Sequence, residues 1–226
     1  MKRTVSALCL IAAFALPAAA FELPGIGKIG APAASGTSSA SVDSLLTQVQ
    51  TLSGSYQGAT KNMLSGREKV LSAFSLKDEA AKVRAQAGKV SSGQVTAEEV
   101  TAASTTMGSA DEAIKKAISD RKKLGKDGKK QLSAGIKEMA AGLKADAAVS
   151  GQAKETASSV GGAMKGAGMA DMPKLQVATE LLTAMGTKLP VDISSTKDTL
   201  GICVEAAKIL NVKVPAGVTE TLSAVK

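Results

Sequence analysis

The sequence predicts an all-α protein, an antiparallel helical bundle of about three long helices followed by a shorter C-terminal helical group. Apolar residues recur at alternating steps of three and four along most of the chain, which is the spacing of one face of a helix. No segment alternates apolar and polar residues for long enough to predict a strand. The expected connections are only a few residues long, which favours antiparallel neighbours in a bundle.

The first 20 residues have the order of a secretory signal peptide. Two basic residues precede the apolar run 5–16, and Pro17 and small residues through Ala20 follow it. About a dozen apolar residues are too few for a helix that crosses a bilayer, which needs about 20. We therefore expect cleavage after Ala20 and export, either to the periplasm or out of the cell. The alternative is an N-terminal anchor that is never cleaved.

After the signal peptide, residues 21–40 are predicted to be a flexible linker, because Gly, Ser and Pro dominate them. The helical domain is predicted to cover 41–226, and a further boundary near 169–173 is left open. We expect no membrane span after cleavage, because no later apolar stretch is long enough.

The first expected helix carries a heptad-like seam, meaning a line of apolar residues that would face a neighbouring helix. Its members are Leu45, Val49, Leu52, Tyr56, Ala59, Met63, Gly66 and Val70. Three glycines, at 54, 58 and 66, each weaken the helix by about 1 kcal/mol relative to alanine and would allow a close helix approach. Ser75 is expected to cap a following helix that ends near Gln86.

Thr96 and Glu99 have the spacing of a capping box at the start of the next helix. A glycine-rich turn at 125–128 separates this helix from a long one that extends to about 164. The C-terminal group is expected to contain a helix that opens at 171–173 and closes at Gly186 and Pro190. Another helix would run from about 195 to 210, and a last turn or two would follow Pro215. The seams are either the core of the bundle or surfaces for self-association, so a homo-oligomer is left open.

The composition excludes most enzyme classes. The chain has no histidine, and only Cys203 would remain after cleavage, so histidine-dependent catalysis, a metal site and a cysteine pair are not expected, and neither is a cofactor. Cys203 would be either buried or paired between chains. Ser119 with Lys122 and Ser194 with Lys197 match the Ser-x-x-Lys spacing of a catalytic dyad. Because the chain is rich in both residue types, chance alone explains two matches, and a Ser-Lys hydrolase is the least favoured function.

The one localised electrostatic feature is a cluster of cations, which we call the basic tip. Loss of the two basic residues of the signal peptide lowers the formal net charge from +8 to +6. The basic tip comprises Lys115, Lys116, Arg121, Lys122, Lys123, Lys126, Lys129, Lys130 and Lys137.

The expected partner of the basic tip is an anionic envelope surface such as lipid or lipopolysaccharide, or a protein. Nucleic acid is disfavoured because no aromatic side chains lie nearby for base stacking. The alternative is a solvated helix end whose cations complement the helix dipole. The sequence thus predicts a non-enzymatic cell-envelope protein, a helical binding or structural module, or alternatively a chaperone-like or surface-binding protein.

Overall fold

The computed structural model describes residues 39–120 and 123–225, and these ranges contain six helices and no strand. The helices are α1 (Ser39–Ala73), α2 (Lys77–Ser92), α3 (Ala97–Ser119), α4 (Lys126–Met164), α5 (Met172–Ile209) and α6 (Val218–Ala224). The predicted all-α bundle is confirmed. The predicted signal peptide and most of the predicted linker lie outside the described residues, and α1 includes the last two residues of that linker.

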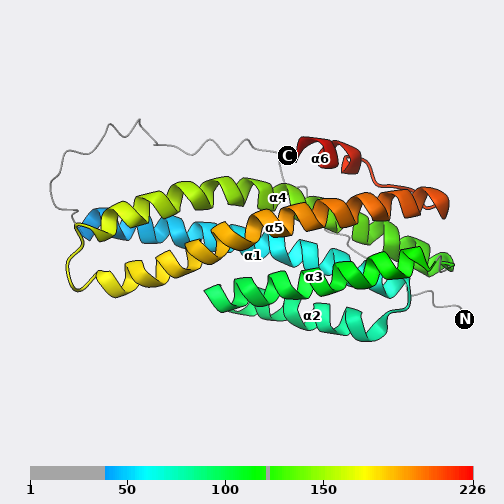
Figure 1. Cartoon of the computed structure of the whole chain (residues 1–226), viewed down its shortest axis with the longest axis horizontal. Coiled ribbons are helices and arrows are strands. Elements are labelled where there is room, and N and C mark those ends of the chain that lie inside the picture. Colours follow the sequence, from blue (N-terminus) through cyan, green and yellow to red (C-terminus); the bar gives the residue numbers. More distant parts are fainter. Residues whose placement is uncertain (1–38, 121–122, 226) are drawn as a thin grey trace, which may run out of the picture. The chain divides into compact units, whose positions relative to one another are not determined.

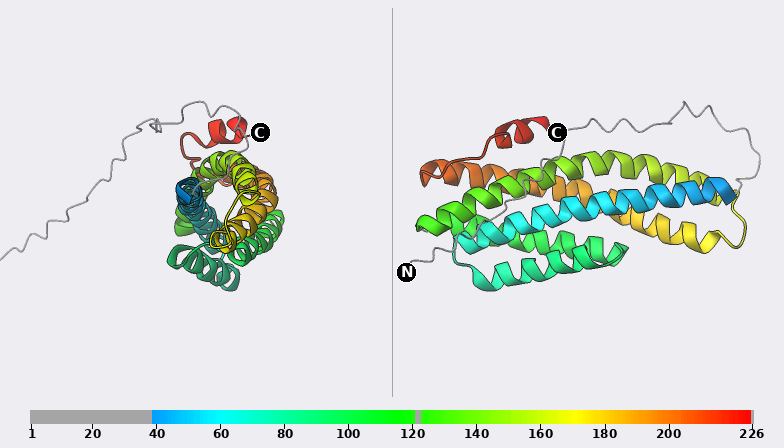
Figure 2. Two further views of the ribbon diagram at one scale, coloured as in Figure 1. Left: turned by 90° about the vertical axis from the view of Figure 1, so that its left-hand side faces the viewer. Right: turned by 180° about the vertical axis from the view of Figure 1, so that it is seen from behind.

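Three long helices, α1, α4 and α5, run side by side, and the α2–α3 hairpin packs on α1 and α5 (Figures 1 and 2). The short α6 lies on α4 and also touches α5. The segment 169–173, where a further boundary was left open, covers the end of the connection between α4 and α5 and the first two residues of α5. None of the described helices has an apolar stretch long enough to cross a bilayer.

A line of glycines brings α4 unusually close to α1. Gly128, Gly135 and Gly142 recur every seven residues and therefore lie on one face of α4. A Cβ atom on Gly135 would lie 2.6 Å from the carbonyl oxygen of Gly66, and one on Gly142 would lie 2.8 Å from the carbonyl oxygen of Ala59. The contacts confirm that Gly66 permits a close helix approach, as the sequence suggested. They also fix the rotation of α4, because only this face can meet α1.

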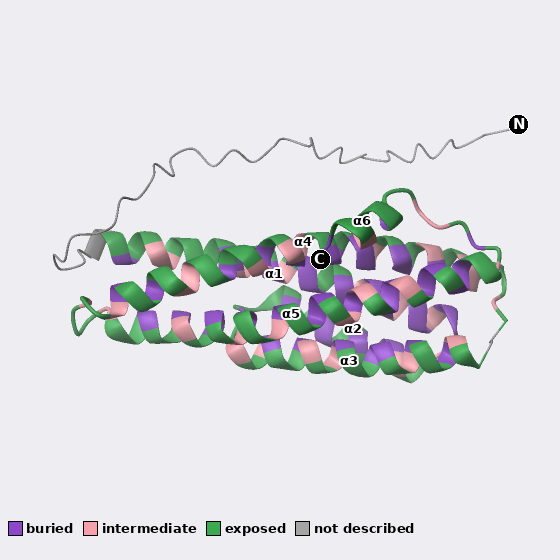
Figure 3. Cartoon of the chain, turned by 45° about the horizontal axis from the view of Figure 1, so that its top comes forward, coloured by how far each residue is buried: buried purple, intermediate pink, exposed green. Residues whose placement is uncertain are grey.

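The buried residues of the helices lie on the faces that meet inside the bundle (Figure 3). Their apolar side chains form two clusters. One cluster contains the second half of α1, the first half of α4 and most of α3, and it includes the residues 193–207 of α5. The other contains the start of α1, the end of α4 and the residues 175–189 of α5. Almost the whole first seam is buried, and Leu45 alone is half-buried. The heptad-like seams therefore form the core.

The two C-terminal helices expected on either side of Pro190 are in fact one helix, α5, with the proline inside it. A proline in a helix interior costs about 3 kcal/mol, because it loses a hydrogen bond and its ring crowds the carbonyl four residues earlier. Pro190 is exposed, whereas Met185, Leu189 and Ile193 on either side of it in sequence are buried. The apolar stripe continues past the proline, and its burial keeps the helix intact.

The prediction that Ser75 caps α2 is wrong, because Ser75 instead ends α1. Its φ of 62° is left-handed, and the Leu76 N–H donates to the Leu71 carbonyl at 2.9 Å while the Ser75 N–H donates to the Ser72 carbonyl at 3.0 Å. These two bonds form a Schellman motif. Helix α2 then starts at Lys77 without a side-chain cap and extends to Ser92, six residues beyond the predicted end.

The capping box at the start of α3 is confirmed. The Glu99 N–H donates to the Thr96 hydroxyl at 3.2 Å, and the Thr96 N–H donates to the Glu99 carboxylate at 3.1 Å. Both bonds satisfy backbone donors that an uncapped helix start would leave free.

Candidate anion-binding groove

Three members of the predicted basic tip line one groove in the structure, and the other described members do not line it. Lys115 and Lys116 are exposed near the end of α3, and α3 packs against α1, α2 and α5 but not against α4. Lys123 lies in the connection and Lys126 in the first turn of α4. Arg121 and Lys122 lie outside the described residues. The members that come together are Lys129, Lys130 and Lys137 on α4.

These three lysines line a surface groove between α4 and the α5–α6 connection, together with a fourth lysine, Lys213. The volume of the groove is about 550 Å³, and none of its lining residues is acidic. The lining is completed by Ser133, Ala134, Asn211, Val212 and Pro215. We call this feature the basic groove. Its composition suits an anion, because four lysines and several polar residues line one hollow.

The end of α5 places Lys213 beside α4. Asn211 has a left-handed φ of 53°, and the Val212 N–H donates to the Ala207 carbonyl at 2.8 Å, so the helix ends in a second Schellman motif. The chain then crosses α4, where the Ser133 hydroxyl donates to the Lys213 carbonyl at 2.9 Å. Asparagine tolerates this backbone conformation better than most residues do. The sequence prediction that α5 ends at Asn211 is consistent with this turn.

The cations on α4 do not complement the helix dipole. Lys126, Lys129 and Lys130 lie in the first turns of α4, where the dipole is equivalent to about half a positive charge. Asp127, the acidic residue in the first turn, pairs only loosely with Lys130: its carboxylate is 4.0 Å from the Lys130 ammonium group, and both side chains are well exposed. A role in stabilising the helix end therefore does not explain these lysines, although it does explain Lys116 in the last turn of α3.

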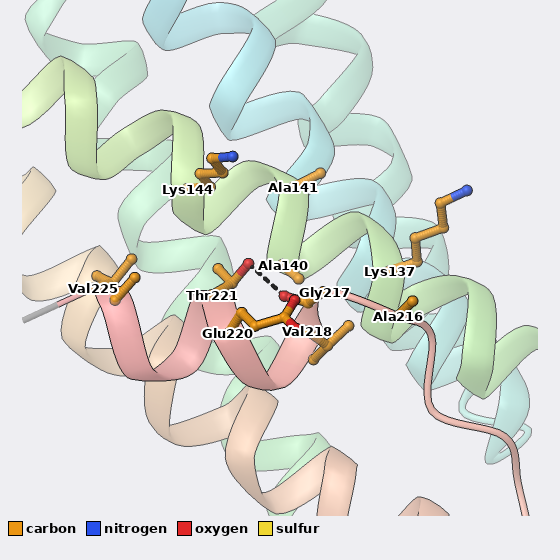
Figure 4. Close-up of a pocket in the computed structure, with 11 residues that line it drawn as sticks. Lys137, Ala140, Ala141, Lys144, Ala216, Gly217, Val218, Glu220, Thr221 and Val225 are labelled. Carbon is orange, nitrogen blue, oxygen red and sulfur yellow. Dashed lines mark hydrogen bonds between the residues drawn. The ribbon is translucent and has the colours of Figure 1, made fainter. Parts of the chain in front are cut away.

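The cationic surface continues along α4 beyond the predicted tip. Lys130, Lys137 and Lys144 each follow a glycine of the α1-facing line by two residues, which turns them about 200° away from α1. Lys137 and Lys144 line a second groove, between α4 and α6, with a volume of about 390 Å³ (Figure 4). Its remaining lining is mostly apolar, with Glu220 as the one acidic group. Lys144 thus extends the basic groove.

The structure describes the geometry of only one of the two Ser-x-x-Lys pairs. Lys122 lies outside the described residues, so the pair with Ser119 has no described geometry. Ser194 and Lys197 line the same surface hollow, but the Lys197 ammonium group donates to the Val225 carbonyl at 2.5 Å. Cys203 is fully buried, and burial raises the pKa of its thiol to about 12. Of the two alternatives for this cysteine, burial is the one observed.

A buried ion pair that the sequence analysis missed joins three helices. Arg67 on α1 is fully buried, and its Nε and Nη2 donate to the two Asp111 carboxylate oxygens of α3 at 2.8 and 2.9 Å. Nη2 also donates to the Thr196 hydroxyl of α5 at 2.8 Å. Ser195 donates to the same Asp111 carboxylate. A bidentate hydrogen bond between an arginine and a carboxylate is among the stronger hydrogen-bonded arrangements in proteins.

A second set of polar residues lies where the two apolar clusters meet, and we call it the polar layer. It comprises the buried residues Tyr56 and Thr60 on α1, Asp146 on α4 and Asp192 on α5, together with the half-buried Ser104 on α3. The Ser104 hydroxyl donates to Asp192 Oδ1 at 2.6 Å. Neither carboxylate oxygen of Asp146 has a hydrogen-bond partner among the described residues. Burial raises the pKa of Asp146 well above its usual value and that of Asp192 to about 6.

The sequence did contain a signal for these residues, since they occupy positions of the heptad-like seams. Arg67 follows Met63 by four residues, and Asp111 follows Met107 by four, so both lie on the core face of their helices. Charged residues at such positions are rarely buried without partners. Among the described residues, no group of three or more Asp, Glu, Cys or His side chains could hold a metal ion.

The fold and the groove together define an all-α bundle with a cationic surface groove. No protein-family model, curated protein or solved structure matches the chain. Its function therefore has to be argued from its own residues.

Proposed function

We propose that this chain is an exported, non-enzymatic protein of the cell envelope that binds anionic surfaces through the basic groove. The observation that carries the proposal is the meeting of Lys129, Lys130, Lys137 and Lys213 around one hollow that has no acidic lining residue. Export rests on the signal-like order of residues 1–20.

Three further features support an anionic ligand. Lys129 and Lys130 lie near the positive end of the α4 dipole, which attracts anions. All four lysines line one groove, and flexible ammonium groups suit the irregularly spaced phosphates or carboxylates of lipid headgroups and acidic polymers. The lysines on α4 continue to Lys144 in the adjoining groove. An extended anionic surface would therefore contact more of these lysines than a single small anion would.

Binding to vesicles of mixed neutral and anionic phospholipid tests the proposal. The association should weaken steeply as salt rises, because the screening length falls from about 30 Å at about 0.01 M to about 8 Å at about 0.15 M. Replacing the four groove lysines by glutamine should abolish most of the binding without unfolding the bundle, since exposed charges contribute little to stability.

The matched control replaces four exposed lysines outside the groove by glutamine, Lys61, Lys82, Lys89 and Lys165. Lys144 is unsuitable as a control because it lines the adjoining groove. Equal losses in both variants would mean that only net charge matters. No loss in either would reject the groove as a binding surface.

A further inference from the structure

The polar layer interrupts the core of the bundle at one level. On α4, Leu143 belongs to one apolar cluster and Val149 to the other, with Asp146 between them. On α5, Asp192 lies at the same kind of boundary, between Leu189 and Ile193. The contact between the two halves of the bundle therefore passes through groups whose charge depends on pH.

The charges at this level do not balance when every acid is ionised. Arg67 is the buried cation, and both of its Asp111 contacts are already made. Asp192 receives one bond from Ser104, but its Oδ2 has no partner among the described residues, and neither has either oxygen of Asp146. Two more buried negative charges would have to share one arginine that is already paired, and burying an unpaired charge is strongly unfavourable.

We propose that the polar layer is a proton-linked lock, in which a proton on Asp146 holds the two halves of the bundle together and its loss at higher pH loosens them. A neutral carboxyl group removes the unpaired charge and supplies an O–H donor. The buried hydroxyl groups of Tyr56 and Thr60 lie on the facing helix and have no partner among the described residues.

The direction of the pH dependence follows from the groups that face Asp146. Burial raises the pKa of Asp146, the charge of Asp192 on α5 raises it further, and Arg67 on α1 opposes both. The pKa of Asp192 is raised to about 6 by burial, against the Ser104 hydrogen bond and Arg67. On α3, Asp111 is held by Arg67, and on α6, Glu220 lines the outer groove rather than the polar layer.

Both carboxyl groups thus hold their protons more tightly in the folded state than in the unfolded chain. Their contribution to stability is complete below the ordinary carboxyl pKa of 3.8. For Asp192 it is lost as the pH rises from there to about 6, and for Asp146 it is lost as the pH rises to the raised pKa of that group, above which stability changes no further. For each linked proton, the folding equilibrium constant falls by up to about tenfold per pH unit in this window.

The test compares urea unfolding of the mature protein with that of Asp146→Asn between about pH 5 and about pH 8.5. Asparagine keeps the shape of the side chain but cannot ionise. The wild type should lose stability relative to the variant as the pH rises, by up to about tenfold in the equilibrium constant per pH unit. Asp127→Asn, whose side chain is 92% exposed, is the matched control and should keep the wild-type slope.

Carbon NMR of the wild-type carboxyl groups decides the question even if Asp146→Asn fails to fold. Asp146 should titrate well above the ordinary carboxyl pKa of 3.8. Equal slopes for the wild type and Asp146→Asn, or an Asp146 carboxyl group that titrates at the ordinary value, would overturn the proposal.

Discussion

The close approach of α1 and α4 predicts that one substitution has opposite effects at two glycines. In Gly135→Ala, the new Cβ would lie 2.6 Å from the Gly66 carbonyl oxygen and 2.7 Å from Val70 Cγ2. The oxygen belongs to the backbone, so no change of rotamer relieves the contact, and α1 has to move away from α4. In Gly108→Ala on α3, by contrast, the new Cβ has nothing within 4 Å.

The magnitudes follow from two opposing terms. Alanine favours a helix over glycine by about 1 kcal/mol, whereas overpacking a core costs about 1–3 kcal/mol. At Gly135 we expect the upper end of that cost, because a backbone atom is involved, and hence a net destabilisation of about 2 kcal/mol. At Gly108 we expect stabilisation by about 0.5–1 kcal/mol.

Urea unfolding followed by circular dichroism measures both changes, provided that the slope of the unfolding free energy against urea stays constant. If Gly135→Ala stabilised the protein as much as Gly108→Ala does, the glycine line would not be a packing interface. The rotation assigned to α4, and with it the exposure of its lysines, would then be wrong.

Three other predictions can be checked with the same preparations. Ser75→Gly should stabilise the bundle by about 1 kcal/mol, because glycine adopts the left-handed conformation at the end of α1 without strain; a loss of stability on urea unfolding would contradict the Schellman motif. Arg67→Ala should destabilise it by about 3–5 kcal/mol by leaving Asp111 buried without its cation, and a change below about 1 kcal/mol would reject a tight buried pair. N-terminal sequencing of the exported protein should begin at Phe21, whereas recovery of the uncleaved N-terminus would refute cleavage after Ala20.

Helix periodicity made most of the fold predictable, and its failures have local physical causes. The capping box of Thr96 and the core seams were read correctly because they depend on residues close in sequence. Pro190 was expected to end a helix, since a proline in a helix interior loses a hydrogen bond. The helix continues because the apolar residues before and after it are buried against other helices, which local sequence cannot show. Ser75 was assigned to the wrong helix because serine suits an N-cap far better than a left-handed C-terminal position.

The candidate site was predictable only in part, because it depends on contacts between distant segments. The cluster of cations in the sequence included Lys129, Lys130 and Lys137, but nothing local indicated that Lys213 would join them. In the sequence, Lys115 appeared to belong to the same cluster of cations. In the structure it lies on α3, which does not pack against α4, and it does not line the basic groove. The sequence did contain one indication of the polar layer: an acidic residue, Asp146, on the core-facing side of an amphipathic helix.

The most direct test of the basic groove is to measure which lysines become protected when the intact mature protein binds anionic vesicles. Amine acetylation, read by mass spectrometry with and without vesicles, reports each exposed ammonium group separately. The basic groove predicts strong protection of Lys129, Lys130, Lys137 and Lys213, and little protection of Lys115. Protection of Lys115 with no change at Lys213 would contradict it and would place binding at the end of α3 instead.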